Sequence, residues 1–227
     1  MNFINAMQQT GNFLKRLQSG TPQRALFVGI VLTIFAVLGA MIYEREQILA
    51  SPTRVMLECE PVDPRSILSG DYVILSYKIS EFVGEEIDRL NVFNEDVRTD
   101  EWIYVALREQ PGTKKPHTAA AFSKDPDRLR ADERFADAIL IRGKAVNSSG
   151  VFSDGPDLTL SAPERAEVDA YRYLELEYGL ESYFVPQREG LWIERELAKA
   201  TVSVAVGPEG QTAVRDLFLD GEKVVFY

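Results

Sequence analysis

The feature that most constrains this chain is a run of nineteen residues without a charge, from Ala25 to Tyr43. At about 1.5 Å per residue, a helix of this length covers about 28 Å, which is close to the hydrocarbon thickness of a bilayer. We therefore predict a single transmembrane helix over residues 25–43. We expect the helix to continue to about Leu49 and to stop before Ser51-Pro52.

The charges on either side of this run predict its orientation. Lys15, Arg16 and Arg24 precede it, whereas the first acidic residue of the chain is Glu44. Because basic residues stay on the cytoplasmic side, we expect a cytoplasmic N-terminus and a C-terminal part outside the cytoplasmic membrane, in the periplasm or its equivalent. The alternative is a cleaved signal peptide, but the run is longer than a usual h-region and no small-x-small cleavage site follows it. The basic segment 1–24 is either an amphipathic helix on the inner membrane surface or a mobile tail.

Small side chains share one face of the predicted helix. Their spacing of four, three and four residues places them above one another: Gly29, Thr33, Ala36 and Ala40. Such a face lets a second transmembrane helix approach closely, although small residues are also common in any membrane helix. We expect this face to pack against a partner.

Beyond the helix the chain is acidic. All 35 acidic residues and 22 of the 25 basic residues lie from Glu44 onward, which gives that part a formal charge of −13. This charge argues against nucleic-acid binding, which needs surplus lysine and arginine. The sequence has one cysteine, Cys59, and one histidine, His117, so it can form neither an internal disulfide nor a Cys/His zinc site. We predict no metal and no cofactor.

The remainder divides into a juxtamembrane segment, 44–52, and one β-rich domain, 53–227, because no long linker or repeat interrupts it. Alternating apolar runs predict strands at 53–59, 72–79, 101–108, 117–123, 138–146, 172–178, 201–206, 212–219 and 223–226. Hairpin turns are expected at 207–210 and 220–221, and short helices at 126–134, capped by Asp125, and 190–200. The predicted fold is mainly β, an antiparallel sandwich or a partly open barrel with one or two short helices.

The clearest strand, 72–79, follows a stretch with turn chemistry that contains Asp63-Pro64 and Gly70. Strand parity places Leu75 and Tyr77 on the more apolar face, and we expect both to pack in the core.

The opposite face begins with Tyr72, beside Asp71 at the end of the turn. We take Asp63, Arg65, Asp71 and Tyr72 as a candidate polar patch that receives a partner or ligand. The structural alternative is that Asp71 accepts backbone hydrogen bonds or pairs with Arg65 and so holds the turn closed.

The residues Gly70-Asp71-Tyr72-Val73-Ile74-Leu75-Ser76-Tyr77, with Asp63-Pro64-Arg65 upstream, spell a GDYxxLxY pattern. Two later stretches strengthen the match to the family named below: Ile141 to Ala145, which includes Arg142 and Gly143, and Tyr178 to Pro186, which includes Gly179, Glu181 and Phe184. Together they resemble the GDYXXLXY family of predicted membrane-anchored bacterial proteins. The resemblance covers about Val55 to the C-terminus. It implies a companion of a polytopic membrane protein in a membrane complex, and it carries over no biochemical activity.

Enzymatic chemistry has little support in the sequence. A serine-lysine peptidase would need Ser66 or Ser69 as nucleophile and Lys78 or Lys144 as a desolvated base, but the Ser-Met-x-Pro motif of those enzymes is absent. We assign no catalytic residue.

The sequence therefore favours a non-enzymatic accessory protein that is held in the bilayer by one helix and binds a polytopic membrane protein. The alternative is a periplasmic module that binds an envelope peptide or glycan. It requires a pocket lined by Tyr72, Arg65 and some of Tyr178, Tyr183 and Phe184.

Overall fold

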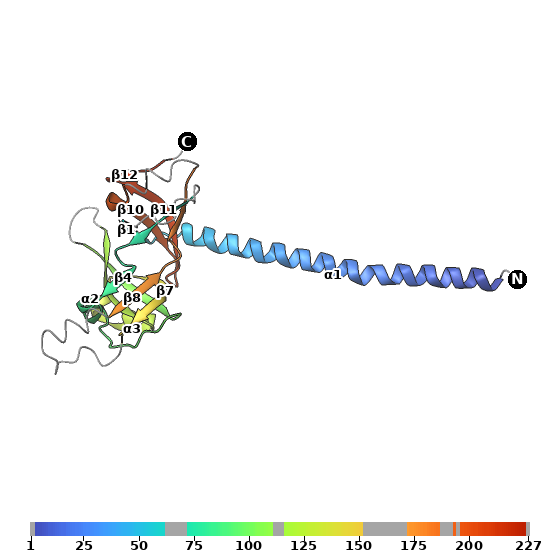
Figure 1. Cartoon of the computed structure of the whole chain (residues 1–227), viewed down its shortest axis with the longest axis horizontal. Helices are drawn as coiled ribbons and strands as arrows, with labels where there is room; N and C mark the ends of the chain where they lie inside the picture. The colour runs from blue at the N-terminus through green and yellow to red at the C-terminus, as the bar shows by residue number, and fades with distance from the viewer. Residues whose placement is uncertain are drawn as a thin grey trace. The chain divides into compact units, whose positions relative to one another are not determined.

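The computed structural model describes residues 3–61, 72–110, 116–151, 172–186, 193 and 196–225, with the backbone alone for residues 3–25 and 72. The chain splits into two compact units, Met1–Glu46 and Gln47–Tyr227. The helices and strands, several of which are labelled in Figure 1, follow one another as α1 (Phe3–Leu49), β1 (Arg54–Glu60), β2 (Tyr72–Ile74), β3 (Ser76–Tyr77), β4 (Glu81–Val83), α2 (Glu85–Leu90), β5 (Trp102–Glu109), β6 (His117–Ser123), α3 (Pro126–Ala131), η1 (Glu133–Phe135), β7 (Ile139–Ser149), β8 (Tyr173–Glu177), β9 (Ser182–Phe184), η2 (Leu197–Lys199), β10 (Ala200–Val206), β11 (Thr212–Leu219) and β12 (Glu222–Lys223).

The first unit is a helix. Its apolar part, Leu26–Leu49, is 24 residues long and is apolar enough to cross a membrane, and its most apolar window has no residue buried inside the molecule. The helix ends where we expected it to end, at Leu49, and the Ser51 N–H donates to the Ile48 carbonyl at 3.0 Å. The backbone is helical from Phe3, so residues 3–24 continue the same helix.

The second unit is mainly β, as predicted. One five-stranded sheet has the order β12-β11-β10-β1-β3, another has the order β4-β8-β7-β5-β6, and β2 and β9 form a two-stranded ribbon. All strand pairings among the described residues are antiparallel. Figure 1 shows β1, β10, β11 and β12 grouped together, and β4, β7 and β8 grouped near α2 and α3. The β structure includes a sheet curled into a half-barrel, which is the partly open barrel of the sequence-based prediction.

One core joins the sheets. Alternation along β1 buries Val55, Leu57 and Cys59, and these side chains share a cluster with Ile103 of β5 and Val202 of β10. A smaller cluster lies under α3 and includes Leu129 and Phe135. Burial raises the pKa of the Cys59 thiol to about 12, so the sulfur stays protonated and behaves as an apolar side chain.

The predicted strand 72–79 is wrong in one respect: it is two short strands with different partners. Up to Leu75 the chain pairs with β9, and the Leu75 N–H donates to the Glu181 carbonyl at 2.8 Å. From Ser76 it pairs with β1, and the Lys78 N–H donates to the Glu58 carbonyl at 3.1 Å. The predicted parity is confirmed, because Val73, Leu75, Tyr77 and Ile79 are all buried.

Three elements were not predicted: the helix α2 and the strands β4 and β9. Acidic side chains in the first turn of α2 and buried Ile87 and Leu90 three residues apart are ordinary helix signals, but the segment has only six residues. The predicted helix 126–134 is confirmed as α3 followed by the short turn η1, and the Asp125 side chain accepts from the Asp127 N–H. Within the predicted helix 190–200 the structure describes residues 193 and 196–200, and the 3₁₀ turn η2 covers Leu197–Lys199.

Candidate functional site

The two stretches that carry the family pattern pair with each other. In the β2–β9 ribbon Tyr72 lies opposite Phe184, Val73 opposite Tyr183 and Ile74 opposite Ser182. These partners are separated by more than 100 positions in the sequence, so the pattern marks a long-range contact rather than a local turn.

Two buried tyrosines hold these two segments together by hydrogen bonds. The Tyr77 hydroxyl donates to the Leu180 carbonyl at 2.9 Å, and the Tyr178 hydroxyl donates to the Ile79 carbonyl at 2.6 Å. The two bonds run in opposite directions between the segments. Burial, and then the nearby Glu181 charge for Tyr178, raises the pKa of both phenols well above its ordinary value, so both remain donors.

Gly143, Gly179 and Glu181, which belong to the family pattern, lie next to Tyr178. A Cβ on Gly143 would lie 2.9 Å from Tyr178 Cε1, so only glycine leaves room for the ring. Gly179 has φ +74°, a conformation that favours glycine, and Glu181 Oε1 accepts from the Tyr178 N–H at 2.6 Å. These residues shape the turn that leads into β9. The motif cluster, as we name it, comprises Leu75, Tyr77, Gly143, Tyr178, Gly179 and Glu181.

The other face of the ribbon is exposed and apolar. Phe184 is 79% exposed and Ile74 is 39% exposed. Pro186 is also exposed, two residues further along the chain. Arg142 lies elsewhere, on β7, where its guanidinium covers the exposed ring of Trp102 at 5.1 Å and its N–H donates to the Gly210 carbonyl at 2.8 Å.

The candidate polar patch lies almost entirely outside the described residues. This applies to Asp63, Arg65, Gly70 and Asp71, while Tyr72 begins β2 and only its backbone is described. Of the aromatic side chains that the alternative pocket required, Tyr178 is buried in the core and Phe184 points outward. The two do not line a common cavity.

The lysines of the peptidase alternative are not desolvated. Lys78 Nζ lies 2.6 Å from Glu58 and Lys144 Nζ lies 2.7 Å from Asp100, and both lysine side chains are about half exposed. Ser66 and Ser69 lie outside the described residues.

The same unit also contains a cavity of about 420 Å³, and we call it the slot. Both edge strands of the sheet β4-β8-β7-β5-β6 border it, β4 through Phe82 and β6 through residues 117–119. Glu58 and Glu60 line it from β1, where alternation puts both on the face opposite the core. Neither acid was predicted as a site residue, because an outward carboxylate on a strand gives no signal of its own in the sequence.

His117 joins two sides of the slot. The Met56 N–H of β1 donates to His117 Nδ1 at 3.2 Å, so the ring bridges β1 and β6 where their backbones do not pair. This bond needs an unprotonated Nδ1, which leaves the proton of the neutral ring on Nε2. Burial lowers the pKa of His117, although the charge of Glu109 opposes this shift.

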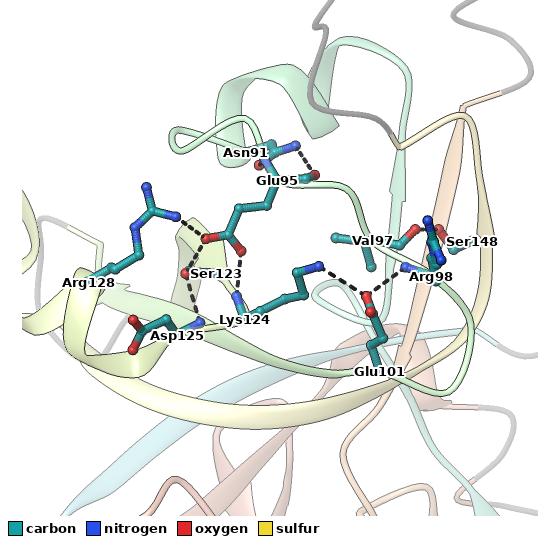
Figure 2. Close-up of polar contacts among 10 residues, drawn as sticks. All are labelled: Asn91, Glu95, Val97, Arg98, Glu101, Ser123, Lys124, Asp125, Arg128 and Ser148. Atoms are coloured by element: carbon teal, nitrogen blue, oxygen red, sulfur yellow. Dashed lines mark hydrogen bonds and ion pairs between the residues drawn. The ribbon is translucent and has the colours of Figure 1, made fainter.

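A third polar site, around the buried acid Glu95, is fully used in holding the loop between α2 and β5 (Figure 2). The Glu95 carboxylate accepts from Ser123 Oγ at 2.9 Å, the Lys124 N–H at 2.6 Å and Arg128 at 2.7 Å. The Asn91 side chain bonds both the N–H and the carbonyl of Glu95. Because these donors satisfy the carboxylate, we assign the cluster a structural role.

The fold and the contacts between the two motif segments define a class of protein. In this class a β-rich domain follows one long apolar helix, and the two motif segments pair as the strands β2 and β9. The family model described as GDYXXLXY protein matches residues 34–217, and the chain belongs to this family. The resemblance inferred from the sequence is therefore confirmed. No curated protein and no solved structure matches the chain.

Proposed function

We propose that this protein is a single-pass membrane-anchored accessory subunit whose β-rich domain lies outside the cytoplasmic membrane and whose partner is a polytopic membrane protein. The observation that carries the proposal is the helix Leu26–Leu49, whose most apolar window has no residue buried inside the part of the molecule that the structure describes. An apolar surface of this size is unstable in water and is accommodated by lipid or by other helices.

The helix offers a specific contact for a partner helix. Nothing lies within 4 Å of the position that a Cβ on Gly29 would take, and Thr33 Oγ1 donates to the Gly29 carbonyl at 2.8 Å. The Thr33 hydroxyl is therefore hydrogen-bonded within the helix. Together with Ala36 and Ala40 it forms a face of small side chains. Close packing between such faces drives association in lipid, where the hydrophobic effect between helices is absent.

The domain adds a second contact. Ile74 and Phe184 form the exposed face of the β2–β9 ribbon, which the motif cluster holds in place from behind. An exposed phenylalanine beside an aliphatic side chain is suited to an apolar segment of the partner that emerges from the membrane.

The test is co-purification after extraction in a mild detergent. We expect the tagged chain to elute with a polytopic membrane protein, and Gly29→Leu plus Ala36→Leu to remove that protein. The matched control, Val31→Leu plus Ile34→Leu, changes the opposite side of the helix and leaves the complex intact. A chain that elutes alone, or a partner retained equally by both double variants, contradicts the proposal.

Orientation and processing are tested separately. A C-terminal alkaline phosphatase fusion is expected to be active and a C-terminal fusion to green fluorescent protein to be dark. Intact-mass measurement of the purified chain is expected to retain the N-terminal segment, whereas a mass that begins after the apolar run supports a cleaved signal sequence instead.

A further inference from the structure

The slot has the features of a binding site that the accessory function does not use. Its apolar part, which we call the floor, is formed by Ile79, Phe82 and Ala119, and the other lining side chains are polar or charged and form its rim. A concave surface on which polar groups converge beside an apolar floor is a common form of ligand site.

The slot also exposes peptide backbone. Among the described residues, β6 pairs with β5 on one side only and β4 pairs with β8 on one side only, so neither strand has a second strand partner there. Residues of both edge strands line the same cavity. β1 also lines the slot, and among the described residues its register with β3 is short, with pairs at Cys59 and Glu60. A chain in extended conformation is the ligand that matches such edges, because its own N–H and carbonyl groups repeat at the same spacing.

The charges of the slot favour a basic group. The two cationic side chains of the slot are already paired with acids: Lys78 pairs with Glu58 at 2.6 Å, and Arg89 pairs with Glu86 at 3.0 Å. Glu60 makes no ion pair with any side chain in the part of the chain that the structure describes. It therefore leaves one negative charge at the rim.

We propose that the slot binds an extended peptide segment that carries a basic side chain, with main-chain hydrogen bonds to the β6 edge and an ion pair to Glu60. The Nε2–H of His117 is available as a further donor to a carbonyl of the peptide, because Met56 occupies the other ring nitrogen. The apolar floor takes the side chain that points inward, next to the basic one.

The test uses the full chain in detergent and fluorescein-labelled pentapeptides, acetylated and amidated, that alternate valine and threonine around a central lysine, glutamine or glutamate. We expect saturable binding of the lysine peptide by fluorescence anisotropy, about tenfold weaker binding of the glutamine peptide and none of the glutamate peptide. Backbone N-methylation of the lysine peptide is expected to abolish binding, since it removes the donors to the strand edge.

Two variants decide between outcomes. Glu60→Gln is expected to erase the tenfold preference for lysine, whereas Glu222→Gln, at an exposed acid on β12, leaves it unchanged. Absence of binding by every peptide overturns the proposal, and so does equal binding of the N-methylated peptide. The outcome is independent of the accessory function, because Gly29→Leu plus Ala36→Leu leaves the slot intact and Glu60→Gln leaves the membrane helix intact.

Discussion

The motif cluster and the slot lie in the same domain and use polar side chains in opposite ways. In the motif cluster each tyrosine hydroxyl is buried and is bonded to a carbonyl of the other segment. In the slot the acids and bases line an open cavity, and Glu60 keeps its charge unpaired within the described residues. A fully satisfied buried network specifies a fold, whereas an open one has capacity left for a ligand. The residues of the motif cluster therefore act in holding the fold together.

The sharpest way to break this comparison is to remove a ring from the motif cluster. Tyr77→Ala leaves a cavity in the core and an unpaired Leu180 carbonyl, and we expect it to lower the free energy of unfolding by about 4 kcal/mol. For a domain of this size that is a fall of about 12 °C in Tm, measured by thermal unfolding of the full chain in detergent.

Phe184→Ala is the matched control for that loss, because it removes an aromatic ring from the exposed face of the same ribbon. We expect this substitution to change the stability by less than about 0.5 kcal/mol. Similar losses for the two variants contradict the division of the ribbon into a folding face and a contact face.

A smaller effect is expected where a single methyl group meets Tyr178. Gly143→Ala puts a Cβ 2.9 Å from Tyr178 Cε1 and forces the ring to move, at a cost of about 2 kcal/mol. Gly179→Ala meets no atom within 4 Å but keeps a positive φ, so it costs about 1 kcal/mol. Chemical denaturation of both variants gives the order, and a larger loss at Gly179 would indicate that backbone conformation, not packing on the ring, governs this turn.

The slot also predicts that the stability of the domain depends on pH, through His117. Burial lowers the pKa of His117 below its usual value of about 6.5, so the unfolded chain binds a proton more readily than the folded chain. The bond from Met56 to Nδ1 thus contributes its full stability above about pH 6.5 and loses it as the pH falls toward the lowered pKa of the folded state. We expect a loss of about 0.5 to 1 kcal/mol by pH 5.5.

The sequence makes this dependence easy to assign, since His117 is its one histidine. Unfolding is measured from pH 7.5 to 5.5 for the natural chain and for His117→Gln, whose side-chain carbonyl can accept the same bond but does not titrate. Parallel pH profiles for the two proteins would rule out the bridge as the source of the dependence.

Sequence patterns were sufficient for the apolar helix, most strands and the parity of the motif. The end of the helix at Leu49 and the burial of Leu75 and Tyr77 follow from local signals: a proline, a charge boundary and a period of two. The break at Leu75 could not be predicted, because it depends on which strand the chain meets and not on its own composition. The slot was missed for a similar reason, since Glu60 and His117 lie on strands of two different sheets and meet only through tertiary packing.

The most direct test compares Tyr178→Phe and Glu60→Gln in two assays on the same preparations. Tyr178→Phe removes the donor to the Ile79 carbonyl, so we expect a loss of about 1 to 2 kcal/mol in stability and unchanged affinity for the lysine peptide. Glu60→Gln is expected to keep its Tm within about 1 °C and to bind that peptide about tenfold more weakly. This opposite pattern is what the separation of folding and binding predicts. A Tyr178→Phe variant that keeps its stability but loses the peptide, or a Glu60→Gln variant that unfolds early and still binds it, would contradict the account.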